Sequence, residues 1–536
     1  MQIQDLSYKL KNDSIEVKDY KVSVEVFSLD NVFTVEPSSY VKENNTYNSN
    51  KILWGNDVAE EGSVKLCVDE HEYYNEFQIT ASLNQNIRSV KLRFDNLPLG
   101  TYISSVDEDK KVTEYGLIFN YPEGWRSLST PLLIFKLENG KYLYISCKDN
   151  IVRRKTFLFK KVNNAMRLDV VLECEATEIA CNFVAPKVEC GISENLDEII
   201  LKHSNHIKEA YGLEEYMDCS IAPSWLKDIS LVVTMHMQTF TGFIFHTYQQ
   251  ALEDMQKITS YLDGKNILVY LAGWEGRYYY KYGDYTCDER MGGETKLREL
   301  VDGLHALGCK VMAMYGMNIM NKNTPALKDI VSIAEFQSIS GARYHSGSVD
   351  WEGAHHYDFN ELVQLNVGCK EYQDYLFNQI KVATDKYDFD GAFLDIAACY
   401  TNDKNNNHYN GVIELCNRLR GIKPDFLVGG EGYYDGLSKA MPLFQSGHTD
   451  GWMHYHDRVS PMLFTRFSRE FAHLCLGDVG RGSTGVHEQG TNTETMTPLR
   501  EGIIPTLSLV EDTVKDHFEK VKEILDQAKE YSRRFL

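Results

Sequence analysis

The sequence predicts an all-β domain followed by a large α/β barrel, and three observations support this fold class. The chain has 536 residues, more than one compact domain usually holds. Up to about residue 190, apolar residues recur at every second position, as they do in half-buried strands. After about residue 226, short apolar runs alternate with longer amphipathic segments, which is typical of repeated βα units. We therefore expect an N-terminal β-sandwich (1–190), a linking helix and loop (191–225) and a (β/α)8 TIM barrel (226–536).

The period-two pattern of the first part predicts an antiparallel sandwich of ten or more strands, because turn-rich pieces such as NNTYNSN and DNLPLG separate the runs. The linker begins where apolar residues take up helical spacing in ENLDEIILKHSNHIKEAYG. The clearest alternating runs are Val22, Val24 and Val26; Val64, Leu66 and Val68; Phe77, Ile79 and Ala81; and Val90, Leu92 and Phe94.

Eight apolar runs in the remaining 310 or so residues match the strand count of a barrel, whose usual size is about 250 to more than 400 residues with insertions. An open doubly wound sheet is the alternative, although no GxGxxG turn follows the first run. The predicted strands span 229–237, 266–274, 310–318, 389–397, 426–434, 448–456, 470–476 and 503–510.

Composition narrows the possible partners. Hydrophobic residues make up 43% and charged residues 25%, and no run approaches the ~20 apolar residues of a membrane span. The net charge of −21, with no basic tract, argues against nucleic acid as a partner. The first residues, MQIQDLSYKL, lack the features of a secretory signal, which indicates a cytoplasmic protein. The twelve cysteines are scattered singly and no cofactor motif is present, so we expect neither a bound cofactor nor a metal.

Two acidic residues end neighbouring strands of the predicted barrel. Asp395 ends the fourth strand and Glu431 the fifth, at the edge where the βα loops of a barrel carry its working residues. Adjacent strands are about 4.8 Å apart, so the two carboxyl groups can approach the ~5–5.5 Å separation of retaining glycosidases. We expect Asp395 to act as the nucleophile and Glu431 as the acid/base. For a single acid the competing interpretation is a helix cap, but Glu is a poor N-cap.

The segments around these acids resemble known motifs. YDFDGAFLDIAACY, followed about one βα unit later by LVGGEGYYDG, is similar to the strand-four and strand-five motifs of retaining α-glycosidases of the α-galactosidase, α-amylase and endo-α-N-acetylgalactosaminidase groups. The resemblance implies a nucleophile at Asp395 and an acid/base at Glu431, and several of these families place a β-sandwich before the barrel. Phe393 stands where the amylase-like members have an Arg.

Other strand ends carry groups that suit a glycan or small glycoside as substrate. Aromatic faces stack on a pyranose ring, while carboxylates, amides and imidazoles bind its hydroxyls. The predicted substrate-binding residues are Trp274, Glu275, Tyr315, Asn318, Tyr400, Tyr433, His454, His456, Asp457 and Arg458.

Two alternatives stay open at this point. A metal-dependent hydrolase in the same barrel would use His454 and His456, an HxH pair, with Asp395, Asp457 or His236. A non-catalytic carbohydrate-binding barrel is the other, because a fold never proves a function. The oligomeric state is open.

Overall fold

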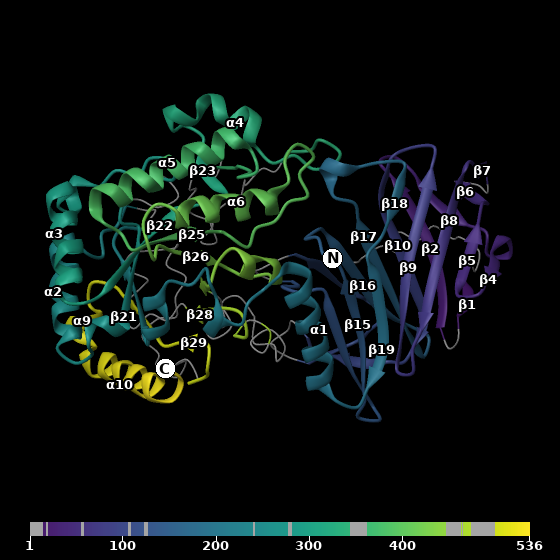
Figure 1. Ribbon diagram of the computed structural model, residues 1–536, viewed down its shortest axis with the longest axis horizontal. Coiled ribbons are helices and arrows are strands. Elements are labelled where there is room, and N and C mark those ends of the chain that lie inside the picture. Colours follow the sequence, from purple (N-terminus) through teal and green to yellow (C-terminus); the bar gives the residue numbers. More distant parts are fainter. Residues whose placement is uncertain are drawn as a thin grey trace.

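The computed structural model has two parts joined by one long helix. It describes residues 14–17, 20–54, 58–104, 109–122, 127–239, 242–276, 281–343, 362–445, 463, 465–472 and 499–536. Figure 1 shows layered sheets on one side, a ring of helices around parallel strands on the other, and α1 (Leu196–Tyr211) between them. Sandwich and barrel, as the sequence predicts, are therefore the two architectural units.

The N-terminal part consists of two large antiparallel sheets that face one another. The first has the order β13-β16-β17-β10-β2-β3-β6-β7, with β1 paired to β2, and the second the order β12-β11-β14-β15-β19-β9-β8-β5-β4, with β18 paired to β9. The first comprises β1 (Ile15–Val17), β2 (Tyr20–Ser28), β3 (Val32–Val35), β6 (Ile52–Trp54), β7 (Val58–Glu60), β10 (Ile87–Leu97), β13 (Leu117–Tyr121), β16 (Lys155–Val162) and β17 (Ala165–Glu173). The second comprises β4 (Val41–Glu43), β5 (Thr46–Ser49), β8 (Gly62–Glu70), β9 (Tyr74–Leu83), β11 (Gly100–Tyr102), β12 (Lys110–Lys111), β14 (Leu132–Leu137), β15 (Tyr142–Lys148), β18 (Asn182–Val184) and β19 (Lys187–Ser193).

The alternating residues fill the space between these sheets. Val22 and Val26 of β2 pair with Phe94 and Val90 of β10, and all four side chains are buried in one apolar cluster. Because successive side chains of a strand point to opposite faces, a period of two puts one whole set into this core. The structure thus confirms both the antiparallel sandwich and the burial of the alternating apolar residues.

The linking helix α1 has defined ends and a buried face. Asn195 caps its start by accepting a hydrogen bond from the Asp197 N–H, and Gly212 ends it with φ +64°, a left-handed conformation that glycine adopts without strain. Ile200 and Ile207 lie on the buried face, and the helix packs against β15 and β19 of the sandwich. The sandwich therefore reaches the barrel through a rigid element.

The C-terminal part is built on a parallel sheet with the order β29-β28-β27-β26-β25-β22-β21-β20-β30. Only Pro505 separates β29 from β30 in the chain, so the sheet returns on itself as in a barrel. The structure assigns nine strand segments within the described residues, where the sequence predicts eight strands. They are β20 (Leu231–His236), β21 (Ile267–Ala272), β22 (Lys310–Gly316), β25 (Gly391–Asp395), β26 (Leu427–Glu431), β27 (Leu443–Gln445), β28 (Arg469–Phe471), β29 (Ile503–Ile504) and β30 (Thr506–Leu509).

The predicted sixth strand differs from the observed one. The structure places β27 between β26 and β28, upstream of the predicted 448–456, which lies outside the described residues. With three residues, β27 is too short for a periodic pattern to reveal it. The other predicted strands overlap observed ones.

Helices surround the barrel and aromatic rings fill its interior. Tyr270, Phe393 and Phe471 come from three different strands and meet inside, with ring centroids 4.3 to 6.0 Å apart. The helices are α2 (Tyr248–Thr259), α3 (Gly293–Ala306), α5 (Lys370–Tyr387), α6 (His408–Arg420), α9 (Thr513–Asp516) and α10 (Phe518–Phe535); α4 (Lys328–Ala334) and the pair β23 (Ile319–Asn321) and β24 (Leu362–Gln364) lie in the long connection after β22.

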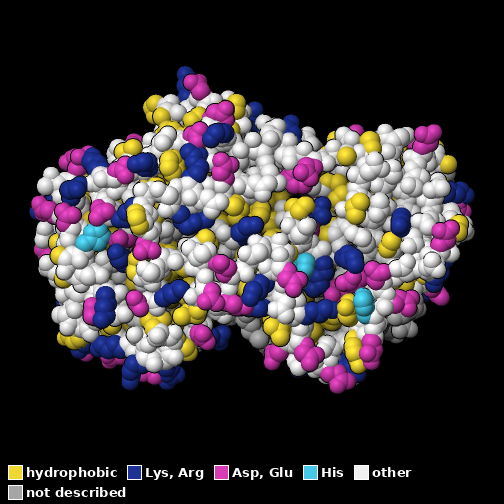
Figure 2. Space-filling view, in the orientation of Figure 1, with side chains coloured by type: hydrophobic (Ala, Val, Ile, Leu, Met, Phe, Trp, Pro, Cys, Tyr) yellow, Lys and Arg dark blue, Asp and Glu magenta, His cyan; other side chains and the backbone are white. Residues whose placement is uncertain are grey.

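The surface carries charges of both signs. Figure 2 shows acidic and basic side chains interspersed over the visible face of both parts, so on this face the net charge is not gathered into one patch. None of the helices in the described ranges has the length and apolar character needed to cross a membrane.

Candidate active site

Asp395 is the last residue of β25, at the edge where the βα loops begin. Gly316 of β22 pairs with it in register, and the Met317 N–H donates to its backbone oxygen at 3.2 Å. Asp395 is buried, with 6% of its surface exposed. The position matches the strand end predicted from the sequence.

Glu431 ends the neighbouring strand β26 at the same height. Leu394 pairs with Gly430, which sets the next residues of the two strands, Asp395 and Glu431, side by side. Glu431 Oε2 also accepts a hydrogen bond from the backbone N–H of Ile396 at 2.9 Å, so its carboxylate reaches the residue that follows Asp395. The structure thus brings the two predicted acids together.

A tyrosine absent from the sequence prediction holds Asp395. The Tyr282 hydroxyl donates to Asp395 Oδ2 at 2.5 Å, and the Tyr282 side chain is fully buried. Gly316 makes room for this ring, since a Cβ at that position would collide with it. A donor to a carboxylate fixes its orientation and stabilises its charge. The tyrosine-rich run GRYYYKYGDY was the available signal, but it does not say which hydroxyl reaches the acid.

Glu275 adds a third carboxyl group behind the pair. It follows β21 by three residues and is fully buried, and within the described part of the chain no other residue donates a hydrogen bond to its carboxyl oxygens. Burial, with a smaller contribution from the charge of Asp395, raises the pKa of Glu275 to about 8. The group is therefore mostly protonated at neutral pH and adds little negative charge beside Asp395.

Asn318 supports the loop that follows Asp395. Its side-chain amide donates to the backbone oxygens of Ile396 at 3.0 Å and Cys399 at 3.4 Å. Its Oδ1 then faces His408 Nε2 at 3.2 Å, and burial lowers the pKa of His408 to about 3, so this imidazole is neutral and donates from Nε2. Asn318 is fully buried and acts on the backbone of the loop in this structure.

Trp274 and Tyr315, predicted to stack on a sugar, lie in the core. Both are fully buried, and their rings meet edge to face at 5.8 Å. The Trp274 indole donates to the Met314 backbone oxygen at 3.0 Å, and its ring also contacts Tyr387 of α5 and Phe389. They pack between the strands and the helical layer, so in this structure they offer no face to a ligand.

Tyr400 and Tyr433 are likewise turned inward. Tyr400 is 7% exposed and donates from its hydroxyl to the Val152 backbone oxygen of the sandwich at 3.4 Å. Tyr433 is 1% exposed, lies 3.1 Å from the Ser438 hydroxyl and packs edge to face on Phe444. Both tyrosines shape the loops beside the acids.

The remaining predicted residues, His454, His456, Asp457 and Arg458, lie outside the described residues. His236 ends β20, is 5% exposed and has its ring 6.3 Å from that of Phe245. Within the described part of the chain, no three His, Cys, Asp or Glu side chains gather closely enough to hold a metal ion.

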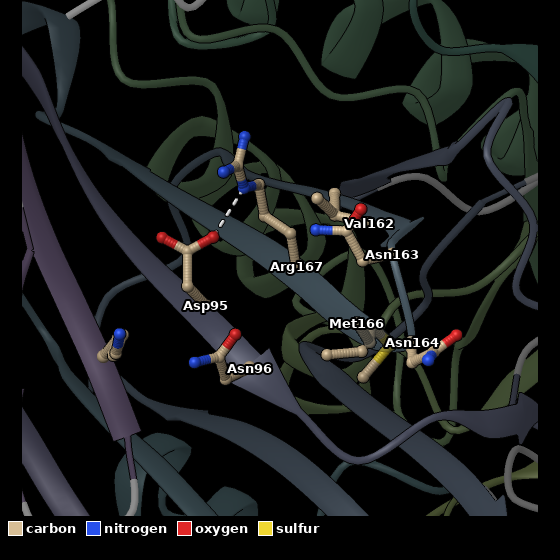
Figure 3. Close-up of a pocket in the computed structure, with 9 residues that line it drawn as sticks. Asp95, Asn96, Val162, Asn163, Asn164, Met166 and Arg167 are labelled. Carbon is tan, nitrogen blue, oxygen red and sulfur yellow. Dashed lines mark hydrogen bonds and ion pairs between the residues drawn. The ribbon is translucent and has the colours of Figure 1, made fainter. Parts of the chain in front are cut away.

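Two hollows of the structure lie on the sandwich, away from the acids. One has a volume of about 420 Å³ and is lined by Asn96, Asn163 and Asn164. In this hollow Arg167 points to Asp95 (Figure 3), and the two side chains pair at 2.6 Å. A second, of about 460 Å³, lies along β2, β10 and β17. Neither of these two hollows is lined by Asp395 or Glu431.

The comparisons with known proteins find relatives by structure alone. No family model and no curated protein sequence matches the chain. Among solved structures, the α-N-acetylgalactosaminidase of Bifidobacterium bifidum in complex with GalNAc is similar over 97% of this chain and 90% of its own, at 10% identity and a TM-score of 0.64. An α-galactosidase of glycoside hydrolase family 36 from Geobacillus stearothermophilus, in complex with raffinose, covers 97% and 76%, at 11% identity and a TM-score of 0.56.

A third similar structure is the galactosidase domain of an α-galactosidase–sucrose kinase, which covers 96% of this chain and 72% of its own, at 16% identity and a TM-score of 0.53. Similarity at such low identity concerns the fold. It confirms that the chain has the layout of α-glycosidases with a sandwich and a barrel, the resemblance that the sequence motifs indicate.

Proposed function

We propose that the protein is a retaining, α-acting glycoside hydrolase in which Asp395 is the nucleophile and Glu431 the acid/base. The observation that carries this proposal is the acidic pair: the two acids end adjacent strands at one height, and Glu431 accepts from the N–H of Ile396 at 2.9 Å. The proposal takes the chain as three units with boundaries at residues 190 and 225, the barrel being the catalytic one.

The first half of the reaction forms a covalent intermediate. Asp395 Oδ attacks the anomeric carbon, the bond to the leaving oxygen breaks, and the Glu431 carboxyl gives its proton to that oxygen. Tyr282 donates to Asp395 Oδ2 at 2.5 Å, and this hydrogen bond fixes the orientation of the carboxylate that attacks. Holding the reacting carboxylate in one geometry lowers the cost of reaching the transition state.

The second half of the reaction hydrolyses the covalent intermediate and regenerates the free enzyme. Glu431, now ionised, removes a proton from a water molecule, whose oxygen attacks the anomeric carbon and displaces the Asp395 carboxylate. Two inversions leave the product with the configuration of the substrate. Because the pKa of Glu275 is raised to about 8, its carboxyl group is mostly protonated at neutral pH and does not repel the charge that returns to Asp395.

We further propose that the substrate is an α-linked galactose or N-acetylgalactosamine glycoside. The similar structures support this class, because their names are those of α-galactosidases and of an α-N-acetylgalactosaminidase, with raffinose and GalNAc bound. His454, His456, Asp457 and Arg458, which follow β27 in the sequence, are proposed to bind the sugar. A cytoplasmic location and the absence of a cofactor stay part of the proposal.

The test is hydrolysis of a matched panel of aryl α- and β-glycosides of galactose, N-acetylgalactosamine and glucose, followed by proton NMR. We expect release from an α-galacto-configured member, an α-anomer as the first product, and no release by Asp395→Asn. A β-anomer as first product, or an Asp395→Asn variant with wild-type turnover, would contradict the mechanism. Inactivity of the wild type on the panel and on an α-GalNAc glycopeptide would contradict the function.

A further inference from the structure

The two loops that follow β25 and β26, called the catalytic loops below, both contact the sandwich. The loop after β25 (396–407) and the loop after β26, which leads into the 3-10 turn Asp435–Lys439, contact residues that belong to a different part of the chain. These contacts are not needed to close the barrel. The role inferred for them here rests on the proposed function.

Asn402 fastens the first loop by three hydrogen bonds. Its Oδ1 accepts from the Ala176 N–H at 2.8 Å, and its amide donates to the Cys174 oxygen at 2.8 Å and to Glu173 Oε2 at 3.3 Å. Asn402 is 7% exposed, so water does not compete for these bonds. The loop that begins one residue after Asp395 is thus tied to the end of β17.

Asp435 fastens the second loop through a buried chain of hydrogen bonds. It accepts from the Tyr121 hydroxyl at 2.6 Å and from the Thr130 hydroxyl at 2.8 Å. Because the Thr130 hydroxyl donates its one proton to Asp435, His203 Nε2 donates to Thr130, at 2.7 Å. Burial lowers the pKa of His203 well below its usual range, so the ring is neutral and Nδ1 accepts from the Ser146 hydroxyl, at 2.8 Å. Every member of this chain has a partner and is buried, which fixes the turn four residues after Glu431.

One sandwich loop contacts both catalytic loops. This interface loop, residues 149–154 between β15 and β16, offers the Val152 oxygen to the Tyr400 hydroxyl and the Arg154 guanidinium to the Tyr400 oxygen, each at 3.4 Å. The Val152 side chain also abuts Gly436, where a Cβ would come within 2.5 Å of Cγ2. Val152 thus lies against the loop after Asp395 and the turn after Glu431 at once.

Two ion pairs stiffen this interface loop, one within it and one to Lys155, the first residue of β16. Asp149 accepts from Arg153 at 2.8 and 3.1 Å and pairs with Lys155 at 2.8 Å. Burial alone would raise the pKa of Asp149, but the charges of Lys155 and Arg153 hold it at about 2. The interface loop is therefore held in one conformation, in which it contacts the loop after β25 and the turn after β26.

We infer that the sandwich is a positioning part of the active site: Tyr121, Asn402 and Asp435, with the interface loop, set the distance between Asp395 and Glu431. The two loops are linked directly at the acids, because the N–H of Ile396, the first residue of the loop after β25, donates to the Glu431 carboxylate. Glu431 in turn directly precedes the loop after β26. These are positioning residues, since none touches the reacting atoms. Displacing the loops then alters turnover more than substrate binding.

A matched pair of substitutions tests this inference in the full-length protein. Tyr121→Phe removes a 2.6 Å hydrogen bond to the buried Asp435, together with a weaker 3.2 Å one between the Tyr121 and Tyr211 hydroxyls. Tyr144→Phe removes a 2.6 Å hydrogen bond to the buried Glu189, where β15 and β19 meet α1. Each change leaves the carboxylate at least one other partner. Both substitutions therefore remove a similar hydrogen bond to a buried carboxylate and should cost similar stability. They differ in that only Tyr121 contacts a loop that follows a catalytic strand.

We expect both variants to lose a similar amount in Tm. Tyr121→Phe should lower kcat about 10-fold with KM within about twofold, since misplacement of ~1 Å can cost up to 100-fold, whereas Tyr144→Phe should keep the wild-type kcat. Asn402→Ala should behave as Tyr121→Phe and provides a second variant should Tyr121→Phe not fold. Amide hydrogen exchange, which needs no substrate, should quicken in 396–403 and 432–437 for Tyr121→Phe alone.

Equal kcat values and equal exchange in these two segments for Tyr121→Phe and Tyr144→Phe would overturn the inference. An inactive wild type would instead contradict the proposed function, and exchange would then still decide whether the sandwich holds the loops.

Discussion

The buried acid Glu275 makes the stability of this protein depend on pH in a way that one substitution removes. Burial raises its pKa from 4.5 to about 8. Between these two values the Glu275 side chain binds more protons in the folded protein than in the unfolded chain. Its contribution to the free energy of unfolding therefore falls as the pH rises through this window and is constant outside it. Glu275→Gln carries no titrating proton and should lose this component.

The size of the effect follows from the same numbers. The two pKa values differ by about 3.5, and each pKa unit is worth about 1.4 kcal/mol, which gives a ceiling of about 5 kcal/mol between pH 4.5 and pH 8. Since the group is fully buried, solvent screening does not reduce this ceiling much. A measured difference of several kcal/mol is expected.

The assay is urea unfolding of wild type and Glu275→Gln at pH 5 and pH 8.5, compared as a double difference so that every other titrating group cancels. Glu414→Gln, an exposed glutamate on α6, is the control and should keep the wild-type dependence on pH. Parallel pH dependences for wild type and Glu275→Gln would refute the reasoning, because they would mean that Glu275 titrates alike in both states.

Three further predictions concern the reaction itself. Asp395→Asn should lower kcat by at least about 10³-fold while shifting Tm little, because the amide keeps the shape of the carboxylate and its acceptor for Tyr282; steady-state kinetics and a thermal melt check it, and an active variant contradicts it. Tyr282→Phe removes a hydrogen bond to a charged group, worth about 1.5–3 kcal/mol, and should lower kcat/KM by about 10- to 150-fold; unchanged kcat/KM would remove Tyr282 from the site. Activity should survive exhaustive treatment with a chelator, and inactivation with rescue by Zn²⁺ would favour the metal-dependent hydrolase that the HxH pair suggests.

The parts of the fold that repeat along the chain could be predicted from the sequence. Val22 and Val26 alternate with polar residues, so the sandwich core follows from spacing alone, and Asp395 and Glu431 follow because each ends an apolar run. The three-residue strand β27 has no such pattern. Its place in the sheet is set by its parallel neighbours β26 and β28.

The parts that depend on contacts distant in sequence could not be predicted. Tyr282 lies 113 residues before the acid that it orients, and Tyr121 lies 314 residues before Asp435. Trp274 and Tyr315 have the residue type and strand-end position of sugar-binding aromatics, but the helical layer covers them. Spacing identifies which residues reach a strand end, and only the packing of the neighbouring elements decides which way they face.

The most direct test of the central claim is azide rescue of Glu431→Gln on the α-galacto-configured aryl glycoside that the wild type cleaves best. If Asp395 forms a covalent intermediate and Glu431 deprotonates water, azide needs no base, so turnover should rise on its addition and the product should be the α-glycosyl azide. A β-glycosyl azide, or a Glu431→Gln variant that hydrolyses the glycoside at the wild-type rate without azide, would contradict the account.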